Sequence, residues 1–407
     1  MSAIIPNKEE RSKFEQAYTL FLKKLNAQLK GAQAILGGSS AKDTWLPQSH
    51  DIDVFVAYDH KKYAEKSSQL SGLLEPILEK LFPKLERVNG SRDYFQIPFQ
   101  DYIFEVVPIL KIEKAEQAVN LTDVSPLHTK WVNGKGKKLK NEIRKAKAFF
   151  KAHRLYGAES YINGFSGYVL EILVINYGSF DKLLQAALKW SEKTVIDYEN
   201  YYQKGMVFYE INKSKLLSPL IVVDPVDKAR NAAAALSLEK FQTLKKVARA
   251  YLKDPSEDYF QQEQISLAQV KKLAKRLPFV YLEITPLKGK RDVVGAKLLK
   301  AFNFLQQELA SFQLQQAAWD YSPQTIFYFI LTKKELPPVE VRSGPPLKLK
   351  NFVADFKKKN KETFSQDGRI YARLKVVHPQ LADFLQFTLK KRYFKEKVAS
   401  VVSKVVV

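Results

Sequence analysis

Two aspartates stand two positions apart at the start of a run of strand-forming residues. Asp51 and Asp53 open residues 51–58, and every other position in this run is apolar or aromatic. Residues two apart in an extended strand point to the same face, about 7 Å apart along the strand. The two carboxylates therefore share one face, while Ile52 and Val54 face the core. The pattern requires a sheet that is buried on one side of this strand and polar on the other.

The paired carboxylates predict a divalent cation. Two like charges side by side repel each other, and without a cation one of them would be driven toward protonation. Magnesium is the expected ion because it prefers hard oxygen ligands and commonly joins carboxylates to substrate phosphates. A third acid, Glu105, stands among apolar residues in a second predicted strand. If the two strands are neighbours, three carboxylates converge and suit two metal ions about 4 Å apart. Taken alone, the Asp51 pair also fits a solvent-facing strand end.

A Gly-Ser pair precedes the aspartates and favours the metal site. Gly38 permits close approach of the backbone to a phosphate, and Ser39 can donate from its hydroxyl and its N–H. A Gly-Ser pair, a spacer of about twelve residues, an Asp-x-Asp pair and a later strand acid follow one another in this chain. This combination resembles the signature of the polymerase-beta-type nucleotidyltransferases.

The chain carries a large excess of positive charge. It has 66 Lys and Arg against 43 Asp and Glu, a formal net charge of +23 over 407 residues. A field of this sign steers polyanions toward the protein, and nucleic acid is the expected partner. No membrane partner is expected, because no stretch approaches the roughly 20 apolar residues of a spanning helix and the start lacks a signal-peptide core. The absence of cysteine excludes disulfides, thiolate metal sites and cysteine nucleophiles. The protein is expected to be cytoplasmic.

Hydrophobic periodicity predicts an α+β N-terminal region. Apolar residues at spacings of three and four predict amphipathic helices over 7–30 and 70–81. Short strand-forming runs predict strands at 32–36 and 52–58, and residues 94–110 predict two strands joined at Gln100 and Asp101.

The composition changes in the middle of the chain. Residues 130–154 hold ten Lys and Arg against one acid, and predict a loop leading into a basic helix. Helical spacing over 167–190, broken at 177–179, predicts a mainly helical region. The stretch from residue 346 to residue 407 is again basic, with 15 basic and 5 acidic residues. The C-terminal part is expected to be α+β, with strands at 279–285, 324–332 and 369–377 and helices at 296–312 and 379–402.

The resemblance extends below the superfamily level. Residues 38–47 followed by 51–55 resemble the catalytic loop of the archaeal-type, class I CCA-adding enzymes, which are tRNA nucleotidyltransferases. The resemblance runs from about residue 37 to residue 237, and beyond it the chain is similar only in layout. Further motifs match in order at residues 125–131, 156–159, 164–168, 223–227 and 230–231.

The resemblance implies an α+β protein of three domains. Residues 1–128 would form the catalytic nucleotidyltransferase head, residues 129–262 a mainly helical nucleotide- and tRNA-binding domain, and residues 263–407 an α+β tRNA-binding domain. The implied activity is template-free addition of CCA to the 3′ end of tRNA from CTP and ATP, with Mg²⁺ as cofactor and release of pyrophosphate. The resemblance leaves open whether the protein forms a homodimer.

The same resemblance implies roles for individual residues. Asp51, Asp53 and Glu105 would be catalytic and hold two magnesium ions. Arg230 would present its planar fork of donors to the incoming base, a chemistry suited to both cytosine and adenine. The triphosphate would be contacted by Ser39, Lys42, Ser125, His128 and Lys151.

Three positions depart from the family pattern. Glu105 stands where Asp is usual, so its carboxylate reaches one methylene further. Lys42 stands where Arg is common, and a lysine offers a point charge in place of a bidentate contact. Ser160, followed by Tyr161, stands where the family has a tyrosine that binds triphosphate.

Simpler structural roles are open for several residues. Lys151 fits a solvated, lysine-rich helix, His128 fits a loop histidine, and Arg230 fits an ion pair with Asp227 three residues earlier on a helix. Three aromatic side chains of the helical region are expected in the core: Phe165, Tyr168 and Tyr177.

Two other functions are also open. A terminal transferase of the same superfamily, a poly(A) polymerase or an oligoadenylate synthetase, would use a single nucleotide. A catalytically silent RNA-binding protein could share the fold, but it would not need all three carboxylates.

Overall fold

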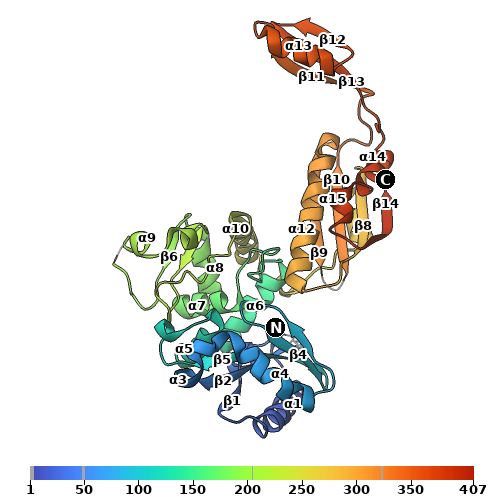
Figure 1. Ribbon diagram of the computed structural model, residues 1–407. Helices are drawn as coiled ribbons and strands as arrows, with labels where there is room; N and C mark the ends of the chain where they lie inside the picture. The colour runs from blue at the N-terminus through green and yellow to red at the C-terminus, as the bar shows by residue number, and fades with distance from the viewer. Residues whose placement is uncertain (1–3, 48–50, 204, 322–323) are drawn as a thin grey trace. The chain divides into compact units, whose positions relative to one another are not determined.

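The computed structural model describes residues 4–47, 51–203, 205–321 and 324–407. These residues form two compact units, Met1–Glu263 and Gln264–Val407, which Figure 1 shows in blue to green and in orange to red. Within the described ranges, no helix combines the length and apolar character needed to cross a membrane.

Five strands form the N-terminal sheet, in the order β1-β2-β5-β4-β3. β2 and β5 run parallel, and the other neighbouring pairs are antiparallel. The strands predicted at 32–36, 52–58 and 94–110 are confirmed. The bounds are β1 Ala32–Leu36, β2 Asp51–Asp59, β3 Glu86–Val88, β4 Tyr94–Phe99 and β5 Tyr102–Lys111.

Two predicted helices pack their apolar faces on this sheet. They are α1, Lys8–Asn26, and α4, Leu70–Leu81. Ile52 and Val54 of β2 are fully buried in the core that these helices close. Asp51 and Asp53 therefore lie on the opposite face of β2, as the alternation predicts. Two short helices flank β2: α2, Gly38–Ala41, before it and α3, His60–Tyr63, after it.

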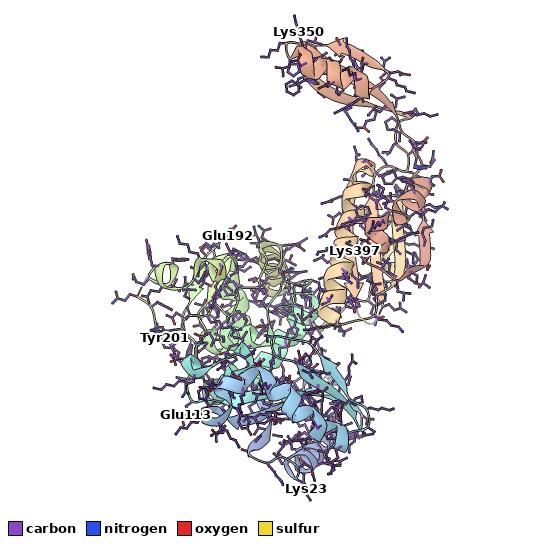
Figure 2. The ribbon with its side chains drawn as sticks, in the orientation of Figure 1. Lys23, Glu113, Glu192, Tyr201, Lys350 and Lys397 are labelled. Carbon is purple, nitrogen blue, oxygen red and sulfur yellow. The ribbon has the colours of Figure 1, made fainter. Side chains whose placement is uncertain are left out.

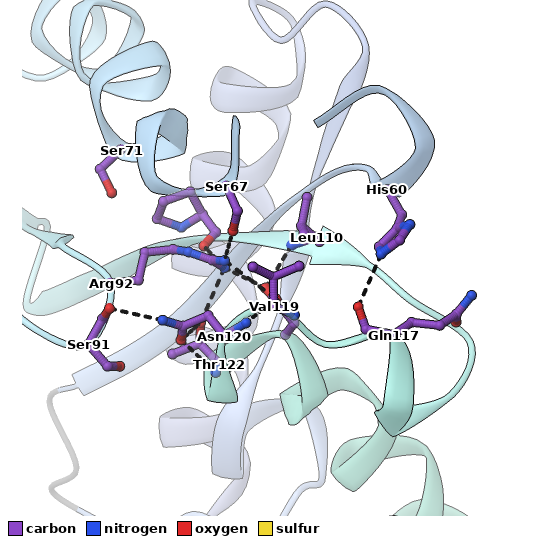
Figure 3. Close-up of polar contacts among 12 residues, drawn as sticks. His60, Ser67, Ser71, Ser91, Arg92, Leu110, Gln117, Val119, Asn120 and Thr122 are labelled. Atoms are coloured by element: carbon purple, nitrogen blue, oxygen red, sulfur yellow. Dashed lines mark hydrogen bonds and ion pairs between the residues drawn. The ribbon is translucent and has the colours of Figure 1, made fainter. Parts of the chain in front are cut away.

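A buried arginine ties the sheet to the segment that follows it (Figure 3). Arg92, between β3 and β4, donates to Pro108 O at 3.0 Å and to Ser67 Oγ at 2.5 Å, and forms an ion pair with Asp123. Asp123 also accepts a hydrogen bond from the N–H of Leu110 at 2.9 Å. Because these buried polar groups satisfy one another, they fix the chain that enters the next helix against β5.

The rest of the first unit is mainly helical, as predicted. Gly178, at φ +82°, ends one helix at the predicted break. The bounds are α5 Ser125–Lys135, α6 Lys140–Ala152, α7 Gly167–Tyr177, α8 Phe180–Lys189, α9 Val207–Glu210 and α10 Leu238–Lys253, with two short paired strands, β6 Thr194–Ile196 and β7 Leu220–Val222.

The loop predicted to start at Lys130 is wrong over its first residues. α5 continues to Lys135, and only residues 136–139 separate it from α6. Val132 is buried, and Asn133 Nδ2 donates to Ala41 O at 3.0 Å. These tertiary contacts hold the helix through Gly134, whose weak intrinsic helix propensity favoured a loop.

The second unit contains two antiparallel sheets. One has the order β14-β8-β10-β9 and shares a core with α12, and the other has the order β11-β13-β12. The strands predicted at 279–285, 324–332 and 369–377 are confirmed as β8, β10 and β13. The bounds are β8 Phe279–Thr285, α12 Arg291–Glu308, β9 Leu314–Tyr321, β10 Thr325–Leu331, β11 Val339–Pro346, α13 Lys350–Lys359, β12 Thr363–Gln366, β13 Arg369–Lys375, α14 Leu381–Leu389, α15 Arg392–Lys395 and β14 Ser400–Val406.

The single closing helix predicted over 379–402 is wrong. α14 and α15 are short, and the chain then enters β14, which pairs with β8. Burial in β14 alternates between exposed and half-buried positions. This period of two belongs to a strand on a sheet, whereas the helical spacing of the preceding residues stops near residue 395.

Candidate active site

The three predicted carboxylates lie on two neighbouring strands. Asp53 of β2 is the register partner of Glu105 of β5, and Asp51 is the partner of Ile103. Register partners point to the same face of a sheet, and so do residues two apart on one strand. Asp51, Asp53 and Glu105 therefore share one face, at the end of the sheet where β2 begins.

These carboxylates carry no neutralising ion pair among the described residues. Glu105 Oε1 accepts a hydrogen bond from Gln96 Nε2 at 2.8 Å, and Gln96 is its register partner on β4. Burial raises the pKa of Asp53, Lys42 opposes this rise and Asp51 reinforces it. Burial also raises the pKa of Glu105, although the hydrogen bond from Gln96 lowers it in part. The site therefore concentrates negative charge that the described side chains only partly balance.

α2 packs directly against Asp53. Gly37 N donates to Asp53 O at 2.8 Å. Gly38 has φ +54°, and a Cβ at this position would lie 1.7 Å from Asp53 Oδ2. Only glycine fits here, for both the backbone conformation and the contact. Ser39, the next residue, is half-buried in α2, so the sequence-predicted Gly-Ser pair lies beside the predicted metal ligand.

Lys42 follows α2 and forms a buried ion pair. Its Nζ lies 2.7 Å from Glu171 Oε2, and the two side chains are 8% and 1% exposed. The family resemblance implied that Lys42 contacts the triphosphate, and no role was predicted for Glu171. Glu171 is the one acid among the mostly apolar residues of α7. Because an acid on a buried helix needs a partner, this position could have been predicted to bind a basic side chain.

Two further residues complete this cluster. Glu171 Oε1 accepts from Thr44 Oγ1 at 2.8 Å and from Lys147 Nζ at 2.8 Å. Burial would raise the pKa of Glu171, but Lys147 and Lys42 hold it at about 2. We call Lys42, Thr44, Lys147 and Glu171 the Glu171 cluster. It joins the loop after α2 to helices α6 and α7.

Asp43 anchors the same loop to α6. Its backbone has φ +50°, in the left-handed region. Arg144, 1% exposed, donates from Nη2 to Asp43 O at 2.6 Å and pairs with the Asp43 carboxylate. Arg11 Nη1 also lies 2.8 Å from Asp43 Oδ1. The conformation of the loop therefore depends on contacts with α6 and α1.

Arg230 pairs with Asp224, not with Asp227. Its Nη1 lies 2.5 Å from Asp224 Oδ2, and Asp224 is fully buried. Asp224 Oδ1 accepts from Tyr168 Oη at 3.0 Å. Residues 224–231 are not helical, so the alternative of a helical ion pair with Asp227 is wrong: the Asp227 carboxylate instead accepts from the N–H of Ala229 at 3.1 Å.

His128 is stacked on Tyr168 beside the same carboxylate. The ring centroids are 4.0 Å apart, at 26°. His128 Nε2 lies 3.2 Å from Asp224 Oδ2, close enough for electrostatic attraction but without hydrogen-bond alignment. Burial lowers the pKa of His128, and the nearby Asp224 carboxylate partly offsets this shift by raising it. His128 lies on α5 rather than in a loop. Tyr168 packs against the core of the helical region, as expected, but it is only half-buried and its hydroxyl bonds Asp224.

The remaining predicted residues lie on α5, α6 and α7 or directly before α7. Ser125 is half-buried at the first position of α5. Lys151 is exposed on α6, and its Nζ lies 5.0 Å from the ring centroid of Tyr156. Desolvation lowers the pKa of Lys151, and the charge of Asp51 opposes this shift. Phe165 is buried as predicted, whereas Tyr177 is half-buried and accepts from Trp190 Nε1 at 3.0 Å.

Exposed basic side chains gather on α13 of the second unit. Lys350, labelled in Figure 2, begins this helix, and three more lysines end it at positions 357–359. All four are exposed, and Phe352 between them is 65% exposed. An exposed aromatic among lysines is the surface chemistry that contacts nucleic acid backbones and bases.

Comparisons with known proteins agree with this geometry. Residues 19–125 match the nucleotidyltransferase domain family, and residues 141–261 match the second domain of tRNA nucleotidyltransferases. A CCA-adding enzyme of Nanoarchaeum equitans is 33% identical over 90% of this chain and 90% of its own length. One of Pyrobaculum aerophilum is 32% identical over 84% of this chain and 80% of its own length.

Among solved structures, a cytoplasmic RNA terminal U-transferase is similar with a TM-score of 0.47, at 13% identity, over 64% of this chain and 96% of that one. The sequence matches cover the N-terminal sheet, the helical region and most of the second unit. The chain therefore belongs to the family of CCA-adding enzymes.

Proposed function

We propose that this chain adds C, C and A to the 3′ end of tRNA, using CTP and ATP and releasing pyrophosphate. The observation that carries the proposal is the register of β2 and β5, which puts Asp53 and Glu105 side by side in a nucleotidyltransferase domain. Family membership supplies the tRNA substrate and the two nucleotides.

A divalent cation site at Asp51, Asp53 and Glu105 is supported by the donor set. Three carboxylates on one face offer only hard oxygen ligands, which suit Mg²⁺. Burial and mutual repulsion raise the pKa of Asp53 and Glu105, and a bound cation would relieve that repulsion. Among the described residues, no three acidic or imidazole groups are already gathered as a metal-binding cluster, so the proposal rests on the shared face of the three carboxylates and on their ligand chemistry. Two magnesium ions, when bound, would activate the 3′-hydroxyl of tRNA and neutralise charge on the departing pyrophosphate.

The chain's own residues would hold and orient the nucleotide. Ser39 and the N–H groups of α2 stand beside Asp53 and would bind phosphate oxygens. Lys151, exposed near Asp51, would bring positive charge to the triphosphate. Ser125 and His128 of α5 would complete the phosphate contacts, and Lys42 would act from its place in the Glu171 cluster. Positioning and electrostatics of this kind supply most of the catalysis in phosphoryl transfer.

Arg230 would read the incoming base. Its ion pair with Asp224 would leave other guanidinium donors for the base, and a planar fork of donors suits acceptors on both cytosine and adenine. The growing RNA end would form the rest of the pocket, so that its shape changes as nucleotides are added.

The basic surfaces would bind tRNA. A folded tRNA offers phosphates of an A-form helix rather than readable base edges, so spread positive charge is the fitting complement. The lysines of α13 supply it together with four exposed lysines of 130–154, at positions 130, 135, 137 and 138. We extend the proposal to three functional domains, 1–128 for catalysis, 129–262 for nucleotide and tRNA, and 263–407 for tRNA.

The test uses the full chain and tRNA that lacks its terminal CCA. All incubations contain Mg²⁺ and labelled nucleotide. CTP alone should add two residues, ATP alone essentially none, and both together three. A long homopolymer from ATP alone would instead identify a poly(A) polymerase or an oligoadenylate synthetase. No incorporation by wild type, with tRNA binding intact, would identify a silent RNA-binding protein.

A further inference from the structure

The loop that follows α2, the helix of Ser39, is held by helices α6 and α7 as well as by its own sheet. After α2, the chain passes through Lys42, Asp43 and Thr44, and each of them contacts α6 or α7. Lys42 and Thr44 both bond Glu171 of α7. A second family match, over residues 141–261, contains Glu171, so this carboxylate joins two segments that match different family domains.

The contacts of Glu171 use both of its oxygens. Oε2 accepts from Lys42 Nζ at 2.7 Å, and Oε1 accepts from Thr44 Oγ1 and Lys147 Nζ, each at 2.8 Å. Lys147 Nζ also donates to Thr44 Oγ1 at 2.8 Å. Lys42, Thr44, Lys147 and Glu171 are at most 7% exposed. The carboxylate is thus the common acceptor of the cluster.

The composition of the cluster is unusual for a purely structural contact. It holds two ammonium groups and one carboxylate, so it carries a formal charge of +1 away from water. Apolar residues of similar volume commonly stabilise a fold as well as a buried ion pair does. A buried cationic cluster therefore calls for a reason besides stability, and its position beside α2 supplies one.

α2 connects the Glu171 cluster to Asp53, one of the predicted metal ligands. At the start of α2, the N–H of Gly37 donates to Asp53 O at 2.8 Å. Gly38 packs so closely against the Asp53 carboxylate that there is no room for a Cβ atom. The other end leads to Lys42 and Thr44. A shift of the loop on the Glu171 side would therefore move Ser39 relative to Asp53.

We propose that Glu171 is a positioning residue for nucleotidyl transfer. It holds Lys42 and Thr44 so that Ser39 and the α2 backbone stand beside Asp53 in the geometry that binds the triphosphate, before any substrate arrives. The inference rests on the proposed function and deepens it, because it assigns the nucleotide-binding geometry of the head to a side chain of α7.

The experiment measures CTP incorporation into tRNA lacking CCA, with the KM for CTP, kcat, the Kd for tRNA and the Tm of each variant. Glu171→Gln removes the shared charge and leaves Lys42 and Lys147 unbalanced. The double variant Lys147→Met/Glu171→Leu removes the shared acceptor and one lysine together. The cluster then keeps its formal charge of +1, which is carried by Lys42. Thr44→Val removes the two hydrogen bonds of Thr44 Oγ1, to Glu171 and from Lys147, and tests the loop without changing the charge of the cluster. Glu239→Gln, at an exposed position of α10, is the matched control.

We expect Glu171→Gln to raise the KM for CTP and lower kcat, with kcat/KM reduced by at least about a hundredfold, and the Kd for tRNA to stay within about twofold. The Lys147→Met/Glu171→Leu variant should regain thermal stability but keep the defect in KM. Thr44→Val should raise the KM for CTP about threefold or more, with a smaller loss of Tm than Glu171→Gln because no charge is removed, and Glu239→Gln should match wild type.

Recovery of wild-type KM and kcat in the Lys147→Met/Glu171→Leu variant would overturn the inference, because Glu171 would then only balance charge. An unchanged KM in Thr44→Val would overturn it as well, even if both Glu171 variants failed to fold. Wild-type protein that does not incorporate CTP at all would refute the proposed function instead, so the two failures are distinguishable.

Discussion

Asp53 and Glu105 face each other across the only parallel strand pair of the N-terminal sheet in the described chain. Parallel register puts the beginnings of β2 and β5 at the same edge, so residues separated by about fifty positions in sequence share one polar face. Asp51 joins them from two positions earlier on β2. The geometry follows from the alternation of carboxylates and buried aliphatic residues, and it supports the metal-dependent chemistry proposed here.

Gly38→Ala should abolish nucleotidyl transfer. A Cβ at this position would lie 1.7 Å from Asp53 Oδ2, and the backbone has φ +54°, so the variant must displace either the carboxylate or α2. We expect CTP incorporation to fall at least about a hundredfold, measured under single-turnover conditions. Gly72→Ala is the matched control: no atom lies within 4 Å of its Cβ, and alanine in α4 should keep full activity and raise stability slightly. Near-wild-type activity of Gly38→Ala would refute the contact.

Asp224→Asn should weaken nucleotide selection more than RNA binding. Asp224 holds Arg230 at 2.5 Å and accepts from Tyr168 Oη, and a neutral amide loses the charge that orients the guanidinium. We expect the preference for CTP over UTP at the first addition to fall about tenfold, with the Kd for tRNA unchanged. Asp227→Asn is the control, since an amide oxygen can still accept from the N–H of Ala229. An equal loss of selectivity in both variants would contradict the role of Asp224.

Acid should selectively weaken the Glu171 cluster. The pKa of Glu171 falls from 4.5 in the unfolded chain to about 2 in the fold. A depressed carboxylate pKa contributes stability that is fully present above about pH 4.5 and is lost as the pH falls toward 2, by about 3 kcal/mol at most. Thermal unfolding at pH 7, 5, 4 and 3 should therefore show a steeper fall in Tm between pH 5 and pH 3 for wild type than for Lys147→Met/Glu171→Leu. Parallel curves would show that Glu171 titrates normally.

Binding to tRNA should depend steeply on salt. With a net charge of +23 and exposed lysines on α13, affinity should fall more than about tenfold between 50 and 200 mM KCl, because phosphate contacts release counterions. Replacing residues 357–359 by glutamine should reduce the slope of log Kd against log[salt] by about 1 for each lysine that contacts phosphate. The control replaces Lys8, Lys23 and Lys84, which removes the same net charge from exposed positions of the first unit. The same change of slope in both variants would argue against α13 as a binding surface.

Local sequence patterns were enough to predict the elements that bear the carboxylates. Strand-forming runs predicted β2 and β5, and the Gly-Ser pair marked the residues that lie beside Asp53, because these signals come from residues close in sequence. The partners of those elements could not be read in the same way. Glu171 bonds Lys42 over 129 positions, and Asp224 rather than Asp227 holds Arg230 because the chain turns at Pro225. The helix expected to close the chain gives way to β14, because this segment pairs with β8, which is distant in sequence.

If Asp51, Asp53 and Glu105 carry out metal-dependent transfer of CMP and AMP to tRNA, loss of one carboxylate must stop the reaction without loosening tRNA. This is tested by the single-turnover rate of labelled CTP incorporation in Mg²⁺, wild type against Asp53→Asn, with the Kd for tRNA measured in parallel. We expect a rate at least about a thousandfold lower in Asp53→Asn with tRNA affinity unchanged. An Asp53→Asn variant that adds CCA at the wild-type rate would contradict it.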